Sequence, residues 1–399
     1  MKYSLIPALF LVLASGKTLA QQEYQVVTVG FYNVENLFTP QDEVDVIVVE
    51  DMIRGDRSST LVLPKTSELE EKMRSQEYYS LSSSNWSEIP YDTIYRDTKD
   101  SDNTPDGDRK YDEAVYRDKL DKLGYALGQM KTDMAPDGPA IIGIAEIENR
   151  EVLEDLAEVI SSETRHYGVV HYDCLYSRGV DVGFLYDSTL FTPISSQSVY
   201  VPLDRHETKD KGRVLTRDIL VVEGDLLGER VHILVNHWPS RSGGQARSNR
   251  LRVGAAEVCR KVVDEILEGD SAAKIIIMGD LNDDPVDESV VDALGTTGDR
   301  DAVVDLYNPW VDDYKNGRGT LAYGGSWNLF DQIIVSKSFI EDDTKGWMFY
   351  KEARTFDAQM LVQEGTYKGG PFRSFAWNNY IGGYSDHLPV MIYLVRPMK

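Results

Sequence analysis

The sequence alternates strongly apolar runs with amphipathic helical stretches, and this alternation limits the folds open to the chain. Residues 26–34 (VVTVGFYNV) and 272–281 (AAKIIIMGDL) are rich in β-branched and aromatic or aliphatic residues, which is typical of buried strands. Between them lie helical stripes, the clearest of which recurs at spacings of three and four from Tyr116 to Met130. Other strand-like runs follow one another directly, as hairpins do. The pattern predicts an α/β sandwich with mixed sheets rather than a purely parallel, doubly wound sheet.

Other segments repeat the same two patterns along the chain. Strands are also predicted at residues 140–149, 180–187, 218–224, 231–238, 327–336 and 388–395. A second helix would place Val152, Leu156, Val159 and Ile160 on one side, and a third would run from Leu251 to a C-terminal cap at Gly269. The sequence shows no internal repeat and no linker between two folding units, so one domain over residues 21–399 is expected.

A long polar stretch at about residues 39–108 interrupts this domain. No helical or strand period lasts in it, although the apolar fragment at residues 44–53 could add a short element. We interpret the stretch as a surface insertion, for which a functional and an inert role both remain open.

The N-terminal residues have the pattern of an export signal. Lys2 supplies a positive start, residues 5–14 are apolar, and residues 18–20 (TLA) resemble a small-residue cleavage site. A buried N-terminal helix is the alternative, and the apolar run is too short for a stable membrane-spanning helix. Lys17 stands where a lipoprotein signal would carry its lipidated cysteine. We therefore predict a signal peptide at residues 1–20 and an exported protein, periplasmic or extracellular, without stable membrane insertion.

The chain is strongly acidic, with a formal net charge of −24. Tight, nonspecific binding to a nucleic-acid duplex depends on many Lys or Arg contacts to phosphate, so this charge argues against it. A local basic patch remains compatible with nuclease activity. Arg241, Arg247, Arg250 and Arg252 form the one such cluster in the sequence, and they could contact phosphate or lie on an exposed loop and helix start.

Cysteine and tryptophan positions leave further alternatives. Cys174 and Cys259 permit one disulfide, but the sequence does not say whether they meet. We interpret Trp238 and Trp327 as core or rim aromatics rather than platforms for stacking a ligand.

Polar side chains occur repeatedly where a predicted buried strand begins or ends. They are Asn33 and Glu35, Glu146 and Glu148, Asn236 and His237, Asp280 and Asn282, Asp331, and Asp386 with His387. Single residues of this kind often cap turns or helices. Active sites of layered α/β folds, however, form at strand ends, on loops held by a rigid sheet. The recurrence therefore predicts one active site that is assembled from several strands.

Three of these residues have the chemistry of metal-assisted hydrolysis. Glu146 offers hard carboxylate oxygens suited to Mg²⁺, which keeps several waters and often uses one or two carboxylates. Asp280 could activate the attacking water. Asn282, two residues on, could hold the nucleophile or a phosphate oxygen without adding negative charge.

Two histidines are candidates for proton donors. A protonated His387 would stabilise the charge that accumulates on oxygen in a pentavalent phosphoryl transition state. Asp331 is a plausible partner that would orient its ring. His237 could be a second donor that assists the leaving group.

The order and wording of these segments resemble a known family, the endonuclease/exonuclease/phosphatase superfamily, and in particular its exported bacterial members. Seven motifs carry the resemblance between about residues 26 and 393: FYNVENLF (31–38), IAEIEN (144–149), RGVDVGFLY (178–186), VNHWPSR (235–241), MGDLNDDP (278–285), FDQIIVS (330–336) and YSDHLPV (384–390). The fold that the resemblance implies is a four-layer sandwich of two packed mixed β-sheets flanked by helices.

The resemblance also implies a metal centre and a set of phosphate contacts. Glu146 matches the principal metal ligand of the family, Glu35 falls near a position that assists metal binding, and Asp386 matches an acid near the metal. Asn33 matches the residue that binds phosphate near the nucleophile. Mg²⁺ is the expected cofactor, with Mn²⁺ or Ca²⁺ as alternatives.

The remaining matches concern proton transfer. Asp280 and Asn282 match the pair that orients and deprotonates water, and His387 matches the phosphate-contacting histidine with Asp331 as its carboxylate partner. His237 aligns with a leaving-group donor of the deoxyribonuclease branch, and Asp181 would be the acid that orients it.

The sequence departs from the family pattern at two places. Ala145 stands where many members carry Gln before the metal ligand, and residues 174–179 (CLYSRG) are less polar than the loop expected there. The first departure bears on fine positioning only. The insertion between Phe38 and Asp108 is a further departure, because it lies close to the first motif and could cover or shape the substrate cleft. The departures leave the chemistry in place and bear on the substrate.

We expect a secreted, monomeric endonuclease on DNA or RNA that hydrolyses phosphodiester bonds by in-line attack of a metal-assisted water. A phosphatase or lipid phosphodiesterase with the same centre is the first alternative, since the net charge mildly favours a small phosphate ester. A catalytically inactive binding module of the same fold is the second.

Overall fold

The computed structural model describes residues 23–41, 43–48, 61–64, 93–97, 103–174, 176, 178–204, 213–214, 216–341, 345–365 and 369–398. The predicted signal peptide, the Leu and Ser of the CLYSRG motif and most of the predicted insertion lie outside these residues.

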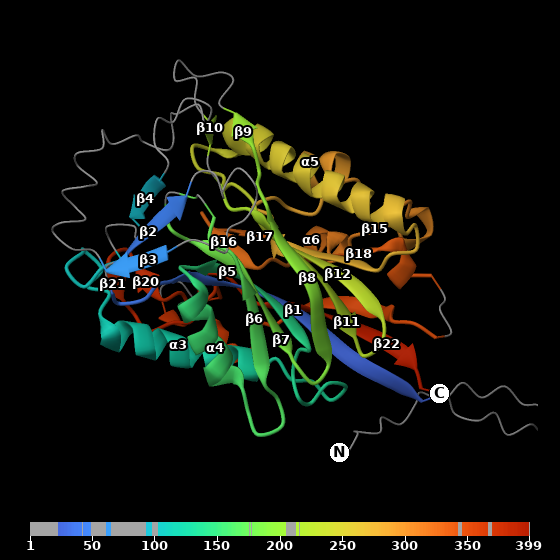
Figure 1. Cartoon of the computed structure of the whole chain (residues 1–399), viewed down its shortest axis with the longest axis horizontal. Helices are drawn as coiled ribbons and strands as arrows, with labels where there is room; N and C mark the ends of the chain where they lie inside the picture. Colours follow the sequence, from blue (N-terminus) through green and yellow to red (C-terminus); the bar gives the residue numbers. More distant parts are fainter. Residues whose placement is uncertain are drawn as a thin grey trace, which may run out of the picture.

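Two mixed β-sheets form the centre of the molecule (Figure 1). The first has six strands in the order β19-β22-β1-β5-β7-β6. Their bounds are β1 (Tyr24–Leu37), β5 (Ile141–Ile147), β6 (Tyr167–His171), β7 (Asp181–Asp187), β19 (Met348–Thr355) and β22 (Val390–Pro397).

The second sheet has seven strands in the order β14-β15-β18-β13-β12-β11-β8. Their bounds are β8 (Phe191–Val199), β11 (Ile219–Leu226), β12 (Arg230–His237), β13 (Ile275–Asp280), β14 (Thr296–Thr297), β15 (Leu306–Tyr307) and β18 (Asp331–Ser336). Both sheets contain parallel and antiparallel pairs, as predicted.

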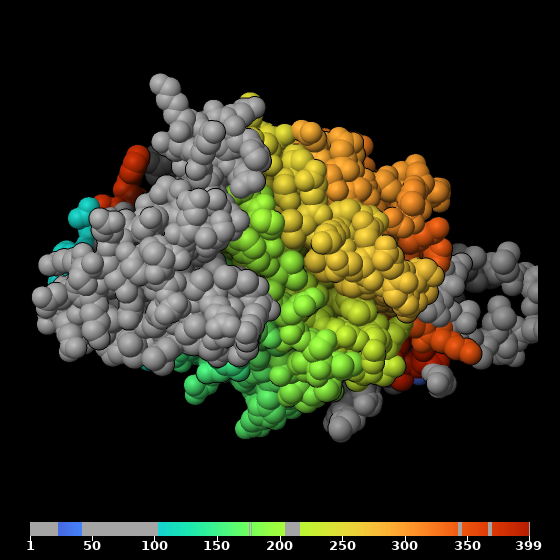
Figure 2. Space-filling view, turned by 45° about the horizontal axis from the view of Figure 1, so that its top comes forward, coloured from blue at the N-terminus to red at the C-terminus, as the bar shows by residue number. Residues whose placement is uncertain are grey.

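Helices cover the outer faces of the two sheets. Helices α3 (Glu113–Gly128) and α4 (Arg150–Ile160) pack on the first sheet, and α5 (Gln245–Gly269) packs on the second. One apolar core fills the space between the sheets. A second lies between the first sheet and its helices, and a third lies between the second sheet and its helix. In Figure 2 the yellow surface of α5 adjoins the lime-green surface of the β8–β11 segment. The predicted α/β four-layer sandwich is therefore confirmed.

Smaller elements decorate this sandwich. They are the sheet β2 (Glu43–Val48), β3 (Leu61–Pro64) and β4 (Thr93–Asp97), the pairs β9 (Leu203–Asp204) with β10 (Arg213–Val214), β16 (Leu321–Tyr323) with β17 (Ser326–Asn328) and β20 (Phe375–Ala376) with β21 (Asn379–Tyr380), the helix α6 (Val311–Lys315), the π-turn η2 (Ser289–Ala293), and the 3₁₀ turns η3 (Arg300–Ala302), η4 (Lys337–Phe339) and η5 (Gln359–Leu361). The small sheet of β2, β3 and β4 lies within the predicted insertion, and β2 overlaps the apolar fragment of that insertion.

Some details of the predicted elements were wrong. Val159 is 39% exposed, and the buried face of α4 consists of Val152, Leu153, Leu156 and Ala157. Gly269 is the last residue of α5 rather than its cap, which is Asp270.

The open questions on cysteine and membrane spans have structural answers. Cys174 and Cys259 are both buried and do not bond to each other. Within the described ranges, no helix has both the length and the hydropathy of a membrane span.

The topology brings distant strand ends to one end of the sandwich. In the first sheet β5 runs parallel to β1 and β22 runs antiparallel to it, so the end of β1 lies beside the start of β22. In the second sheet β13 runs parallel to β12 and antiparallel to β18, which repeats the arrangement. The polar residues at these strand ends therefore converge.

Candidate active site

Asp280 lies at the centre of the converging residues. It is the last residue of β13 and is buried. Its cross-strand neighbours are His237 at the end of β12 and Asp331 at the start of β18. Asn33 Nδ2 donates to its Oδ2 at 3.0 Å, and the backbone N–H of Asn282 donates to its Oδ1 at 2.9 Å. The carboxylate is thus fixed by one neighbour from each sheet.

His387 faces Asp280 from the loop that precedes β22. Its Nδ1 lies 2.7 Å from Asp331 Oδ2, and its Nε2 lies 3.9 Å from Asp280 Oδ2. Asp331 thereby orients the ring so that Nε2 points towards the space in front of Asp280. The structure brings together the two residues that the sequence paired.

The electrostatics assign these groups different protonation states. Burial raises the pKa of Asp280 to about 7, although the charge of His387 opposes this change. Burial would lower the pKa of His387, but the charges of Asp331 and Asp280 and the hydrogen bond to Asp331 raise it well above its ordinary value. Asp280 can therefore take a proton near neutral pH, while His387 carries one.

Asn282 is held beside this base by a second contact. Its Nδ2 donates to the main-chain oxygen of Trp238 at 3.0 Å. Trp238 itself is buried, as a core aromatic, and its Nε1 donates to Asn236 Oδ1.

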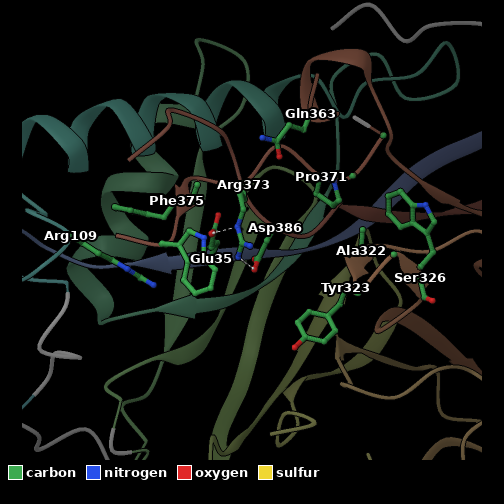
Figure 3. A pocket seen from close by; sticks show the side chains of 17 residues that line it. Glu35, Arg109, Ala322, Tyr323, Ser326, Gln363, Pro371, Arg373, Phe375 and Asp386 are labelled. Atoms are coloured by element: carbon green, nitrogen blue, oxygen red, sulfur yellow. Dashed lines mark hydrogen bonds and ion pairs between the residues drawn. The ribbon is translucent and has the colours of Figure 1, made fainter. Parts of the chain in front are cut away.

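A second cluster of charged residues lies close to the one around Asp280. It contains the carboxylates of Glu35 and Asp386. Glu35 Oε2 accepts a hydrogen bond from the backbone of Ser374 at 2.6 Å. Arg373 lies between the two acids, 2.9 Å from Asp386 Oδ2 and 3.6 Å from Glu35 Oε1 (Figure 3). The buried Lys119 donates to the main-chain oxygen of Glu35 and to Ser374 Oγ.

Arg373 and Lys119 already accompany the two acids of this cluster, and burial is the main cause of the pKa shifts within it. Burial, together with the charge of Asp386, raises the pKa of Glu35 to about 7. Burial lowers the pKa of Lys119 to about 8, although the charges of Glu35, Asp386 and Glu146 oppose the change. A cation placed among these carboxylates would relieve their repulsion.

Glu146 lies near the end of β5 in an unusual backbone conformation. Its φ is +68°, and Glu35 (+53°), Asn36 (+57°) and Asn282 (+50°) share the left-handed region. Few residues other than glycine adopt this region, and such residues cluster at functional sites. The side chain of Glu146 points towards His237, with Oε1 3.9 Å from Nε2.

The structure does not form the predicted His237–Asp181 pair. Asp181 Oδ2 lies 3.2 Å from His171 Nε2, and its Oδ1 accepts from the backbone of Cys174. His237 Nδ1 is buried and has no hydrogen-bond partner among the described residues. Asp181 therefore orients His171, which lies on the neighbouring strand β6 opposite Gly183.

His237 nevertheless lines the site. Its Nε2 lies 3.5 Å from Asp280 Oδ2. Burial lowers its pKa well below the ordinary value, and the charges of Arg217, His387 and Arg178 add to this effect. These contributions outweigh the nearby carboxylates, so His237 is a neutral imidazole that can donate only its single N–H.

The remaining polar candidates are structural. Glu148 Oε2 accepts from both the backbone and the hydroxyl of Thr39, and Asn236 Nδ2 donates to the main-chain oxygen of Leu234. These contacts tie strand ends together.

The predicted basic cluster is also largely structural. Arg252 is fully buried and lies 2.7 Å from Asp283, and Arg241 lies 2.6 Å from Asp287. Arg241 also donates to the main-chain oxygen of Asn282. These two arginines therefore stabilise the loop that follows β13, and they do not form a phosphate-binding patch.

Sequence reasoning missed three residues that support the site. Ser385 Oγ donates to the main-chain oxygen of Asn33 at 2.6 Å and accepts from the backbone of His387. Lys119 and Arg373 surround Glu35 as described above. Lys119 had a signal in the sequence, because it is a charged residue within an apolar helical stripe.

The described residues contain two compact sets of side chains that could hold a metal ion. Two groups of described residues have ligand atoms within 4.8 Å of one another, namely His171–Asp173–Asp181 and Asp280–Asp331–His387. The predicted metal ligands Glu146, Glu35 and Asp386 do not form such a group. An open set of carboxylates suits Mg²⁺, whose coordination is normally completed by water and substrate phosphate.

Comparison with known proteins places this geometry in context. The sequence model of the Endonuclease/Exonuclease/phosphatase family matches residues 82–396 of this chain. No curated protein matches the chain.

Solved structures give more distant similarities. A Bacteroides thetaiotaomicron protein described as belonging to the endonuclease/exonuclease/phosphatase family has 16% identity and a TM-score of 0.47, over 94% of this chain and 97% of that one. A mannosyl-6-phosphatase of the same organism has 16% identity and a TM-score of 0.45, over 92% and 99%. Truncated TDP2 from Caenorhabditis elegans has 16% identity and a TM-score of 0.43, over 71% and 93%. These similarities are too low to assign a substrate.

Proposed function

The chain belongs to the Endonuclease/Exonuclease/phosphatase family, whose members hydrolyse phosphoester bonds, and we propose that it hydrolyses phosphodiesters in DNA or RNA by in-line attack of water. The observation that carries the proposal is the arrangement around Asp280. A buried carboxylate with a pKa of about 7 faces a histidine whose pKa is raised, at 3.9 Å. A base and a charged donor on either side of one small space suit phosphoryl transfer.

Each group has a defined task in this reaction. Asp280 accepts the proton of the attacking water, and the amide of Asn282 holds that water in position. His387 donates from Nε2 to a non-bridging phosphate oxygen as negative charge develops there. Asn33 uses one Nδ2 hydrogen to fix Asp280, which leaves the other for the phosphate.

The leaving group has a neutral neighbour. His237 carries no charge at neutral pH because of its burial and the surrounding cations. We therefore assign it a hydrogen bond to the departing oxygen rather than full proton transfer as an imidazolium acid, and the departing oxygen takes its proton from solvent water.

A divalent cation would be held by Glu146 with help from Glu35 or Asp386. When bound, it would neutralise charge on the phosphate oxygens and lower the pKa of nearby water. Mg²⁺ suits these oxygen donors, and Mn²⁺ or Ca²⁺ are the alternatives.

We also propose that the protein acts outside the cytoplasm as a monomer. The N-terminal signal pattern of residues 1–20 supports export. A nuclease of this kind would degrade external nucleic acid.

The test is product release by the purified chain lacking residues 1–20, with Mg²⁺ and with EDTA. The substrates are plasmid DNA, single-stranded RNA, bis-p-nitrophenyl phosphate and p-nitrophenyl phosphate, with His387→Ala as the control variant. Metal-dependent cleavage of nucleic acid that the variant lacks would support the proposal. Activity on the monoester alone would identify a phosphatase. Inactivity on all four substrates, and on phospholipid tested in addition, would indicate a binding module.

A further inference from the structure

A groove of about 800 Å³ leads away from the carboxylates of the site. Glu35 and Asp386 line it together with Arg373, which lies between them in Figure 3. Arg109 and Phe375 lie on one side of these acids, and the β16–β17 hairpin lies on the other. A substrate whose phosphate reaches the site would place its attached group in this groove.

Exposed aromatic side chains are concentrated along this groove. Five aromatic residues are exposed among the described residues, and three of them line this groove: Tyr323 (80% exposed), Trp327 (36%) and Trp377 (88%). Both exposed tryptophans are among them. Large aromatic surface left in water at a single place is typical of a binding site for a flat, apolar group.

Trp377 adopts a backbone conformation that is unfavourable for its size. It occupies the first central position of the two-residue turn between β20 and β21, with a φ of +57°. Glycine or asparagine is the usual residue in such a position, and a bulky side chain there is an outlier. Because the side chain is 88% exposed and so has little burial to offset this strain, its presence at this position indicates a role in binding rather than in folding.

Tyr323 is held rigidly relative to the catalytic histidine. Its hairpin turns at Gly324 and Gly325, whose φ values of +59° and +83° suit a tight two-residue turn. At the base of the hairpin, Leu321 forms a β-bridge with His387, and the backbone of Leu388 donates to Thr320 at 2.8 Å. The aromatic ring is therefore carried by an element that is bonded to the active-site loop.

Two arginines line the groove and balance the charges of its two carboxylates, Glu35 and Asp386, in a chain with a net charge of −24. Arg373 lies beside the carboxylates, and Arg109 lies further along, 5.0 Å from the centre of the Phe375 ring. Two separated cations match a substrate with a second phosphate beyond the one being cleaved. A sugar monophosphate has no second phosphate to offer.

We propose that this groove binds the unstacked bases of single-stranded nucleic acid, which makes single strands the preferred substrate class of the phosphodiesterase function proposed above. Bases that are not paired can stack on Tyr323 and Trp377, whereas the bases of a duplex are hidden. Trp327 adds to this surface, although its sequence position alone indicated a core or rim aromatic rather than a stacking platform. Duplex binding also needs many phosphate contacts, and the groove supplies two arginines. The inference rests on the proposed function only for the position of the scissile phosphate.

The experiment measures binding of a short fluorescein-labelled oligothymidylate by fluorescence anisotropy in Mg²⁺, with a phosphorothioate backbone to suppress turnover. The same sequence annealed to its complement is the duplex probe. The variants are Trp377→Gly, Tyr323→Ala and, as a matched control, Tyr125→Ala, because Tyr125 is an exposed aromatic on α3 outside the groove. Trp377→Gly is chosen because glycine relieves the strained φ, so thermal stability should be kept or raised while the ring is lost.

We expect the single strand to bind more tightly than the duplex, and Trp377→Gly and Tyr323→Ala each to weaken binding about tenfold, the typical loss of one base–aromatic stack. Tyr125→Ala should bind like the wild type. Equal or tighter duplex binding, wild-type affinity of both groove variants, or no binding by the wild type would each overturn the inference. Hydrolysis of bis-p-nitrophenyl phosphate by the wild type is measured separately, so failure of the chemistry is distinguished from failure of the groove.

Discussion

At the scale of single residues, the site depends on a few groups whose burial or backbone conformation is energetically unfavourable. Asp280 is buried with a raised pKa, and Glu35, Glu146 and Asn282 have positive φ values. Burial of a carboxylate and strain in the backbone both oppose folding, so their concentration at one place indicates function. The types of these residues were predictable from the sequence, because polar groups that end buried strands are conspicuous.

Their partners were less predictable. Arg373 belongs to a loop without periodic pattern, and only the fold places it between Glu35 and Asp386. Asp181 was paired with the wrong histidine because β6 was not predicted, and His171 lies on that strand.

Asp280→Asn keeps the size and most contacts of the side chain but removes the base. We expect the kcat for phosphodiester hydrolysis to fall by about 10² to 10⁴-fold, the usual contribution of general acid–base catalysis. Circular dichroism should show an unchanged fold. Activity within a few-fold of the wild type would show that another group takes the proton.

At the scale of elements, the central strands were predictable and the edge strands were not. Four of the five missed strands are edge strands, namely β6 and β19 in the first sheet and β8 and β14 in the second. The fifth is β15, a strand of only two residues beside β14. An edge strand is covered on fewer sides, so it lacks the continuous apolar run that identifies a central strand. In β8 most side chains are at least partly exposed.

The pairing of β6 with β7 makes stability depend on pH through His171. Burial alone would lower the pKa of His171, but the hydrogen bond to Asp181 and the charges of Asp173 and Asp181 raise it above 6.5. The stabilisation is therefore complete below the unfolded-state pKa and is lost as the pH rises through the folded-state pKa. The free energy of unfolding in urea is measured below the unfolded-state pKa of His171 and above its folded-state pKa. His171→Gln should lower this free energy more at the acidic pH. His166→Gln, at an exposed histidine, is the control, and an equal loss at both pH values for His171→Gln would contradict the assignment.

At the scale of the whole molecule, the site exists because two sheets meet closely. Gly143 on β5 faces Met278 on β13, and a Cβ at residue 143 would lie 2.5 Å from Met278 Sδ and 2.9 Å from Phe31. The sequence predicted the layers, but not which strands of one sheet oppose which strands of the other. That information lies in side-chain packing between segments far apart in the chain.

Gly143→Ala should therefore destabilise the fold by about 1–3 kcal/mol, the usual cost of overpacking a core. Gly128→Ala is the matched control, since nothing lies within 4 Å of its added Cβ. Chemical denaturation measures both variants. A stability of Gly143→Ala equal to that of Gly128→Ala would mean that the sheets separate at little cost.

The central claim is that carboxylates from both sheets assemble a metal-dependent phosphodiesterase. It is tested most directly by the initial rate of bis-p-nitrophenyl phosphate hydrolysis by the wild type and by Glu146→Gln, in Mg²⁺, in EDTA and after Mg²⁺ is restored. We predict that EDTA abolishes the wild-type rate, that restored Mg²⁺ recovers it, and that Glu146→Gln is at least about a hundredfold slower. A rate that resists EDTA, or a Glu146→Gln variant as fast as the wild type, would contradict the claim.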